Sequence, residues 1–229
     1  PIVSVVVDPK SPRDKRTLYA SAFEDGVYKS TDDGQTWEKR SNGLGVPGVN
    51  TRACRIILHP DGTLFCLVTA LRKGDEFAAE GPGLYRSRDG GQTWEWINAT
   101  KPLLWPKDFD VDPRDSGVVY LGAADAGRGP APREGGLYKT TDGGATWTRL
   151  ARKGWDCFGA TISKHHPDWV YLCIAEGADD SGLWLSKDAG GTWGALEGLP
   201  FRNAQRVAFD PDDPSVIYVC TFGGSVWKG

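Results

Sequence analysis

The chain has 229 residues, enough for one domain with a sizeable core, and 27 Lys and Arg stand against 30 Asp and Glu. The formal net charge of −3 excludes the strongly basic balance typical of proteins that bind nucleic acids or anionic membrane surfaces. No apolar run has the length of a membrane-spanning helix, so we expect no nucleic-acid partner and no membrane insertion. Thirty Gly, 15 Pro and ten Trp are typical of many turns that join short aromatic strands, which predicts an all-β protein.

Taken from the N-terminus, the chain repeats one four-stranded pattern, with strands here called A to D. The predicted A strands are 2–7, 53–58, 108–111, 157–163 and 205–209, and the B strands are 17–22, 63–69, 118–123, 169–175 and 216–221. The C strands begin at Gly26, Gly83, Gly136, Gly182 and Ser225, and the D strands are 36–40, 93–97, 146–150 and 192–196. These repeats divide a single domain, 1–229, into blades of approximately 1–43, 44–98, 99–151, 152–198 and 199–229.

A twelve-residue unit links strands C and D in four of the repeats. The copies are GVYKSTDDGQTW from Gly26, GLYRSRDGGQTW from Gly83, GLYKTTDGGATW from Gly136 and GLWLSKDAGGTW from Gly182. The aliphatic and aromatic pair begins a strand, Asp and Gly make a tight turn, and Trp opens the next strand as an apolar anchor. We expect each Asp to accept hydrogen bonds from backbone N–H groups of its turn. The residues assigned to this structural role are Asp32, Trp37, Asp89, Trp94, Asp142, Trp147, Asp188 and Trp193.

The same unit argues against a bound metal. A calcium loop needs alternating oxygen ligands, which the unit lacks. The five Cys contain no C-x-x-C pair, which argues against a zinc site. We therefore expect no metal and no cofactor.

The fifth repeat stops after its C strand. Its D strand and its twelve-residue unit are missing, and the chain contains no Met. We expect a C-terminal fragment of a longer protein, with a three-stranded last blade, an open arc of blades, and the remaining blades of the same full-length chain as a partner. The competing expectation is a compact five-bladed ring whose last blade lacks its outer strand.

The pattern Ser/Thr-x-Asp-x-Gly-x-Thr-Trp resembles the Asp-box, or BNR repeat. The resemblance implies a β-propeller related to sialidases, xyloglucan-active glycoside hydrolases, sortilin-type receptors and a photosystem II assembly factor. It also favours an extracellular or periplasmic location. Because these proteins share the repeat and differ in what they do, the resemblance fixes the fold more closely than the function.

Antiparallel strands place alternate connections on opposite faces of the blades. The A-to-B turns and the Asp-boxes share one face, here the Asp-box face. The B-to-C loops and the connectors between blades share the other, here the loop face, which receives the long loops 70–82 and 124–135. Because recognition usually resides in loops on a rigid scaffold, we place any site on the loop face.

Two Trp and two Asp on the loop face are candidate site residues. Trp105 and Trp155 lie near the ends of successive connectors, and Asp108 and Asp156 lie at the starts of the strands that follow. A Trp ring can stack on a sugar while a carboxylate binds its hydroxyls, and most glycosidases use two carboxylates. These Asp are the candidate catalytic residues and these Trp are candidate ligand contacts. The alternative is that both Trp cap the core and both Asp bind turn backbone.

Four Arg can line the same face and hold an anionic ligand. They are Arg55, Arg72, Arg133 and Arg206. Solvated loop charge is the alternative account of each. Sialidases carry an Arg-Ile-Pro motif, and Arg55-Ile56-Ile57 departs from it at Pro, which puts sialidase activity in doubt.

The sequence thus predicts an Asp-box propeller whose loop face binds carbohydrate, either as a glycan-binding domain or as part of a glycoside-hydrolase-like enzyme. No complete catalytic motif is visible. The alternative is a non-enzymatic scaffold or assembly factor that binds another protein on the same face. The first reading expects a glycan ligand and the second a protein ligand.

Overall fold

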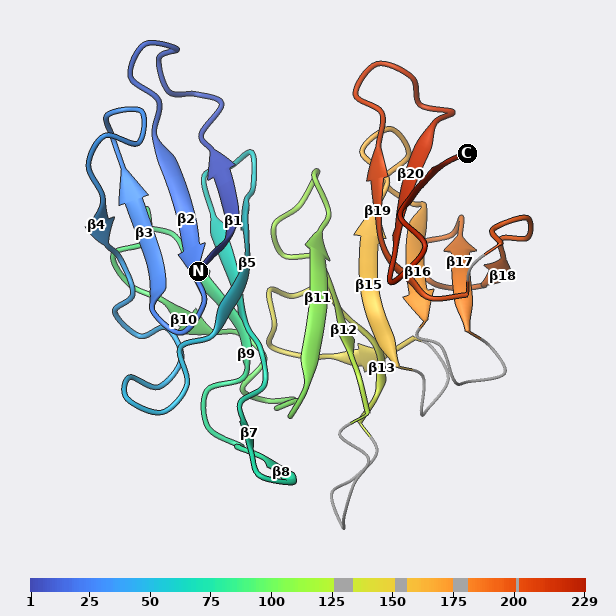
Figure 1. Ribbon diagram of the computed structural model, residues 1–229, viewed down its shortest axis with the longest axis horizontal. Helices are drawn as coiled ribbons and strands as arrows, with labels where there is room; N and C mark the ends of the chain where they lie inside the picture. Colours follow the sequence, from blue (N-terminus) through green and yellow to red (C-terminus); the bar gives the residue numbers. More distant parts are fainter. Residues whose placement is uncertain (126–133, 151–155, 175–180, 201) are drawn as a thin grey trace. The chain divides into compact units, whose positions relative to one another are not determined.

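The computed structural model describes residues 1–125, 134–150, 156–174, 181–200 and 202–229. The described residues form β-strands, turns and irregular segments, without a helix. The chain divides into two compact units, Pro1–Pro106 and Lys107–Gly229, which are described separately. Both units consist of narrow antiparallel sheets in which successive strands pair with one another, except that Leu64–Val68 pairs with Gly83–Ser87 across an inserted hairpin (Figure 1).

Unit 1 contains two four-stranded sheets and a short hairpin. The first sheet has the order β1 (Ile2–Val7), β2 (Leu18–Ala22), β3 (Gly26–Ser30) and β4 (Glu38–Lys39). The second has the order β5 (Ala53–Leu58), β6 (Leu64–Val68), β9 (Gly83–Ser87) and β10 (Glu95–Trp96). The hairpin pairs β7 (Arg72–Lys73) with β8 (Glu76–Phe77) inside the long loop between β6 and β9. Figure 1 shows this hairpin extending beyond the loop-face end of β9.

Unit 2 contains two four-stranded sheets and one three-stranded sheet. The first comprises β11 (Pro106–Val111), β12 (Val119–Ala123), β13 (Gly136–Thr140) and β14 (Thr148–Arg149). The second comprises β15 (Cys157–Ile162), β16 (Val170–Ile174), β17 (Gly182–Ser186) and β18 (Gly194–Ala195). The last comprises β19 (Ala204–Phe209), β20 (Ile217–Thr221) and β21 (Val226–Lys228). The predicted all-β blades and the three-stranded last blade are confirmed, and the open arc stays a prediction.

The outer strands are shorter than predicted. The D strands were expected to have five residues, and each has two because the residues before them belong to the Asp-box turn. Thr36, for example, donates both its N–H and its hydroxyl to Asp32. The A, B and C strands begin and end within two residues of the expected positions. The β7–β8 hairpin was not predicted, because its loop contains no copy of the repeat.

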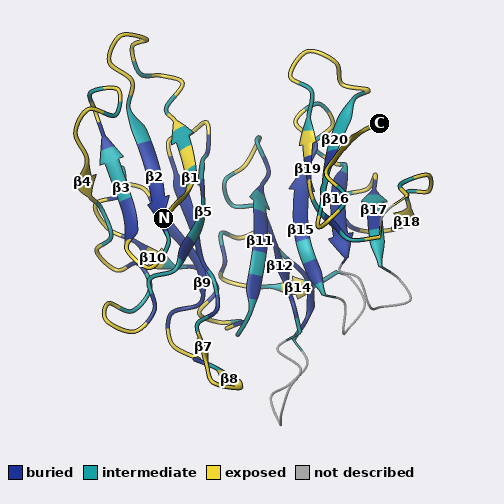
Figure 2. Cartoon of the chain, viewed as in Figure 1, coloured by how far each residue is buried: buried dark blue, intermediate teal, exposed yellow. Residues whose placement is uncertain are grey.

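The core lies between neighbouring sheets of the same unit. In unit 1, Tyr19 and Val27 of the first sheet pack with Ile56 and Leu64 of the second. In unit 2, Tyr120 and Leu137 pack with the next sheet, whose other side packs with the last sheet. Figure 2 shows the buried residues concentrated on the middle strands, which carry the aliphatic and aromatic residues of the repeat. Burial of these faces is the main stabilising contribution to such a fold.

The Asp-box Trp residues pack toward the preceding sheet where that sheet lies in the same unit. Trp94 is 7% exposed, and its indole N–H donates to the carbonyl of Arg40 in the first sheet at 2.8 Å. Trp193 packs against the cluster that contains Tyr120 and Leu137. Trp37, in the first sheet, is 41% exposed. The Trp anchors therefore join one sheet to the sheet before it.

Candidate binding site

Four Asp-box turns present the same hydrogen-bond network. In the turn of Asp142, the Thr140 hydroxyl donates to Oδ1 at 2.7 Å, and the Thr146 N–H and hydroxyl donate to Oδ1 and Oδ2 at 2.9 and 2.6 Å. Equivalent bonds surround the Asp of the other three turns. Both carboxylate oxygens are therefore engaged in holding the turn.

These bonds stabilise the charged form of each carboxylate. They lower the pKa of Asp32, Asp89, Asp142 and Asp188 to about 2. The Thr hydroxyl is the largest cause in the first three turns, and the backbone N–H of Thr192 is the largest cause at Asp188. A carboxylate held in this way is a poor proton donor near neutral pH. The Asp-box face thus provides scaffold rather than acid–base chemistry.

The opposite ends of the sheets, on the loop face, carry a repeated irregularity. The pairing register of the first strand shifts by one residue in β1, β5, β15 and β19. After each shift, the first paired residues are Ser4, Arg55, Gly159 and Arg206. A β-bulge re-aims the side chains beside it and is common next to functional sites. The sequence pattern gave no signal for these bulges.

In unit 2 this end contains a buried carboxylate held by an arginine. Asp108 on β11 is 0% exposed and accepts two hydrogen bonds from Arg206 on β19, from Nη2 at 2.8 Å and from Nε at 3.3 Å. The Arg206 side chain is 47% exposed. Its Nη1 has no partner among the described residues. The pair therefore fixes a guanidinium group that keeps donors toward solvent.

A glycine packs against the backbone of the residue before Arg206. Gly159 on β15 takes the same place in its strand as Arg206 takes in β19. A Cβ at Gly159 would lie 2.2 Å from the carbonyl oxygen of Gln205, so no side chain fits there. Strand β15 therefore approaches the backbone of β19 closely at the residue before Arg206, and only Gly allows this approach. Sequence analysis named both charged residues but missed Gly159.

The second predicted carboxylate lies at the start of β15. Oδ1 of Asp156 accepts a hydrogen bond from the backbone N–H of Asp125 at 2.5 Å, and the residue is partly exposed. Two residues after Asp156, the ring of Phe158 contacts Lys107, whose Nζ lies 4.1 Å from the ring centre. Asp156 therefore joins two loop-face segments of unit 2 while one of its oxygens stays outside that bond.

Unit 1 contains three more of the predicted residues. Trp105 is partly buried, and its ring centre lies 5.0 Å from that of Phe77 in the β7–β8 hairpin. Arg72 is exposed and forms an ion pair with Asp75 at 3.2 Å within the same hairpin. Arg55 is partly buried on β5. Trp155 and Arg133 lie outside the described residues.

Strand D pairs with strand C near the loop face, and the space around this pair is here called the corner of the sheet. The residues at the corner differ from sheet to sheet. The aromatic residue of each C strand pairs with the residue two positions after the Asp-box Trp. These pairs are Tyr28 with Lys39, Tyr85 with Trp96, Tyr138 with Arg149, and Trp184 with Ala195. The second side chain varies from Trp to Ala while the Asp-box itself stays the same, so each sheet closes its corner differently.

Two of these corners contain cavities. One of about 550 Å³ in the first sheet is lined by Glu24, Asp25, Lys39, Ser41, Asn42, Leu44, Pro47, Gly48 and Thr51. One of about 340 Å³ beside β17 and β18 is lined by Ser181, Gly182, Leu183, Trp184, Ala195, Leu196, Glu197, Gly198, Leu199 and Arg202. In the second sheet, by contrast, Trp96 stacks on Tyr85 with ring centres 6.2 Å apart and fills the corner. Sequence analysis did not single out these cavities.

Two classes of feature were also searched in the described part of the chain. No group of three or more His, Cys, Asp and Glu side chains is placed to hold a metal ion there. No helix of the described residues is long and apolar enough to cross a membrane.

Comparison with known proteins identifies the repeat and the fold. A family model described as BNR/Asp-box repeat matches residues 28–39 and 85–95. The xyloglucanase Xgh74A of Acetivibrio thermocellus is 24% identical over 88% of this chain, which spans 28% of that enzyme. The GH74 xyloglucanase of Xanthomonas campestris superposes on 99% of the chain with a TM-score of 0.72 and 19% identity, over 36% of its own length. The structure of YCF48 bound to D1 peptide covers 100% of the chain with a TM-score of 0.61 and 17% identity, over 64% of its length.

The chain is therefore an Asp-box β-propeller similar to glycoside hydrolases of the xyloglucanase type. It spans about a third of the length of the two xyloglucanases. The likeness to a peptide-bound protein shows that the same fold also occurs with a protein ligand.

Proposed function

We propose that the loop face of this chain binds a glycan and forms part of the binding surface of a glycoside-hydrolase-like propeller. The observation that carries the proposal is the half-exposed Arg206, fixed by the buried Asp108 at the loop-face end of the first strand. A preorganised guanidinium loses little conformational freedom when it donates to sugar hydroxyls. The similarity to xyloglucanases along most of the chain makes a plant-type β-glucan such as xyloglucan the first ligand to test.

Further loop-face residues are candidate contacts, each within its own unit. Lys107, held over the Phe158 ring, supplies a second cation near the start of β11. Trp105, which is partly buried and packs against Phe77, remains a proposed contact for a sugar ring. Arg55, Arg72, Arg133 and Trp155 remain proposed contacts.

Asp108 and Asp156 remain the proposed catalytic pair. A glycosidase needs two carboxyl groups about 5 to 10 Å apart. Because both oxygens of Asp108 accept bonds from Arg206, Asp108 can reach a ligand only when Arg206 releases it. Among the described residues, Asp156 accepts a hydrogen bond through one oxygen, and the residue is partly exposed, which suits it better to proton transfer. If the pair is catalytic, Asp156→Asn abolishes release of reducing ends from xyloglucan and leaves binding in place.

The binding proposal is tested by calorimetric titration of xyloglucan oligosaccharides into the 229-residue chain. Arg206→Lys keeps a cation beside Asp108 but lacks the outward-facing guanidinium donor, so we expect at least a fivefold loss of affinity. Arg13→Lys, at an exposed position on the Asp-box face, serves as the matched control and should bind as the wild type does. Equal affinity of both variants would remove Arg206 from the site.

A second candidate function is protein binding, and one observation favours it. Strand β1 exposes a strip of apolar side chains, Ile2, Val3, Val5 and Val7, that are 46 to 58% exposed. Exposed apolar strips of this kind mark interaction surfaces. A glycan array without a hit, together with binding to an extended apolar peptide that Val5→Asp abolishes, would favour the scaffold over the glycan-binding domain.

A further inference from the structure

We propose that the 550 Å³ corner cavity of the first sheet is a separate binding site for a neutral saccharide. The cavity lies on the loop face of unit 1, between the β2–β3 turn and the connector that follows β4. Its volume is within the range of sites that hold small ligands. The inference goes beyond the proposed function because it requires neither Arg206 nor Asp108.

The walls of the cavity are held in place by bonds that do not involve a ligand. The Ser41 hydroxyl bonds to the backbone N–H and carbonyl of Val27, at 2.8 and 3.1 Å. Leu44 is fully buried and anchors the connector in the core. The Thr51 hydroxyl donates to the carbonyl of Glu24 at 2.8 Å. A ligand would therefore meet a preformed site and would not have to order its walls.

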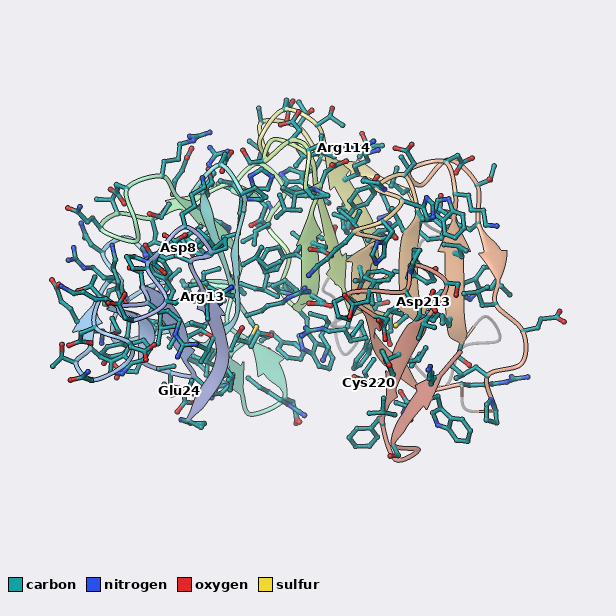
Figure 3. All side chains as sticks on the ribbon, turned by 90° about the horizontal axis from the view of Figure 1, so that it is seen from above. Asp8, Arg13, Glu24, Arg114, Asp213 and Cys220 are labelled. Carbon is teal, nitrogen blue, oxygen red and sulfur yellow. The ribbon has the colours of Figure 1, made fainter. Side chains whose placement is uncertain are left out.

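The charged groups at the cavity neutralise one another. Asp25 accepts from Lys39, and Glu24, labelled in Figure 3, accepts from Arg52 through a single oxygen, Oε1. Each pair leaves capacity unused, because Lys39 keeps two further N–H donors and Oε2 of Glu24 has no partner among the described residues. With no net charge, the site favours a neutral ligand over an ion.

The unused groups match the hydrogen-bonding capacity of a sugar. Each sugar hydroxyl donates one hydrogen bond and accepts others, so it needs an acceptor and a donor close together. Asn42 is exposed at the cavity, and its side-chain amide, which provides both, has no partner among the described residues. Pro47 adds an exposed apolar surface for the C–H face of a ring. Donors, acceptors and an apolar wall around one cavity indicate a polyhydroxylated ring.

The second sheet shows how the same corner is closed. Trp96 holds the position of Lys39, stacks on Tyr85, and donates to the side chain of Asn98 at 2.7 Å. The second sheet thus accommodates a Trp at the position that Lys39 occupies in the first sheet, where the corner stays open. Lys39→Trp is therefore a filling substitution that the fold already uses.

The test is calorimetric titration of cellotetraose and of a xyloglucan oligosaccharide into four forms of the 229-residue chain: wild type, Lys39→Trp, Arg206→Lys and the double variant. We expect Lys39→Trp to remove one binding event, with at least a tenfold loss of affinity, and Arg206→Lys to retain that event. Asn42→Ala, which changes only an exposed side chain, should weaken the same event about threefold. Lys15→Trp, an equal substitution at an exposed turn of the Asp-box face, should change nothing.

The outcomes separate this site from the one at Arg206. If Arg206→Lys has no effect and Lys39→Trp removes binding, the corner site stands and the proposed function fails. If Lys39→Trp and Asn42→Ala both bind as the wild type does while their unfolding midpoints match it, the corner site is overturned. If neither saccharide binds to the wild type, the corner site is overturned as well.

Discussion

The two ends of each sheet differ in how far they are fixed by the repeat. At the Asp-box end, the bond from the Ser or Thr hydroxyl to Oδ1 of the Asp is 2.7 Å in all four turns. At the loop-face end, the first residues after the register shifts are Ser4, Arg55, Gly159 and Arg206, so this position holds a hydroxyl, a guanidinium or no side chain, depending on the sheet. The repeat thus builds one end as a uniform scaffold and leaves the other end free to vary, which is where we place binding.

The largest expected effect sharpens this comparison at the loop-face end. Arg206→Ala should lower the free energy of unfolding by about 3 kcal/mol, near the low end of the range for breaking a buried ion pair, because the substitution leaves the buried Asp108 charge without its guanidinium. Urea unfolding followed by Trp fluorescence measures the change. Arg13→Ala, at the exposed position labelled in Figure 3, should change it by less than about 0.5 kcal/mol. Equal values for the two variants would show that Arg206 stabilises nothing.

A smaller effect is expected at the Asp-box end, and it depends on pH. The pKa of Asp142 is about 2 in the folded chain, below the value of about 3.9 in an unfolded chain. Its contribution to stability is therefore fully present above about pH 4 and is lost as the pH falls toward 2. Asp142→Asn should lower the unfolding midpoint at pH 7 and flatten its decline between pH 4 and 2. A decline as steep as in an Asp14→Asn control would contradict the role of the turn network.

The smallest effect concerns backbone strain in one Asp-box turn. The residue after the Asp has a positive φ in all four turns; it is Gly at 90 and 143, Asp33 at φ 61° and Ala189 at φ 55°. An L-residue there costs about 1 to 2 kcal/mol, partly offset by the entropy that Gly loses on folding, so Ala189→Gly should stabilise the chain by up to about 1 kcal/mol. Gly143→Ala should act in the opposite direction. Thermal unfolding of both variants checks the pair, and a shift of the same sign in both would sink this account.

The fold followed from the sequence because the repeat is local. Each copy carries its own strand, turn and anchor, so spacing alone located the blades and the shortened last one. The short D strands were mispredicted because Thr36 belongs to the turn through its bonds to Asp32. The start of the D strand depends on these hydrogen bonds, and the sequence alone does not show which residues form them.

The candidate sites were less predictable because they depend on distant residues. Arg206 and Asp108 are 98 positions apart in the chain and meet only in the folded protein. The corner cavity depends on the residue two positions after the Asp-box Trp, whose identity changes from Lys39 to Trp96 between sheets. That variation against a constant repeat is a signal in the sequence, and aligning the copies two positions further would have found it.

The most direct test of glycan binding at the loop face is hydrogen exchange of the whole chain with and without a xyloglucan oligosaccharide. The account predicts slower exchange in the loop-face segments, at the start of β19 around Arg206 and in the connector 41–52. It predicts unchanged exchange in the Asp-box turns 30–37, 87–94, 140–147 and 186–193. Slower exchange confined to those turns, or no change anywhere at saturating oligosaccharide, would contradict it.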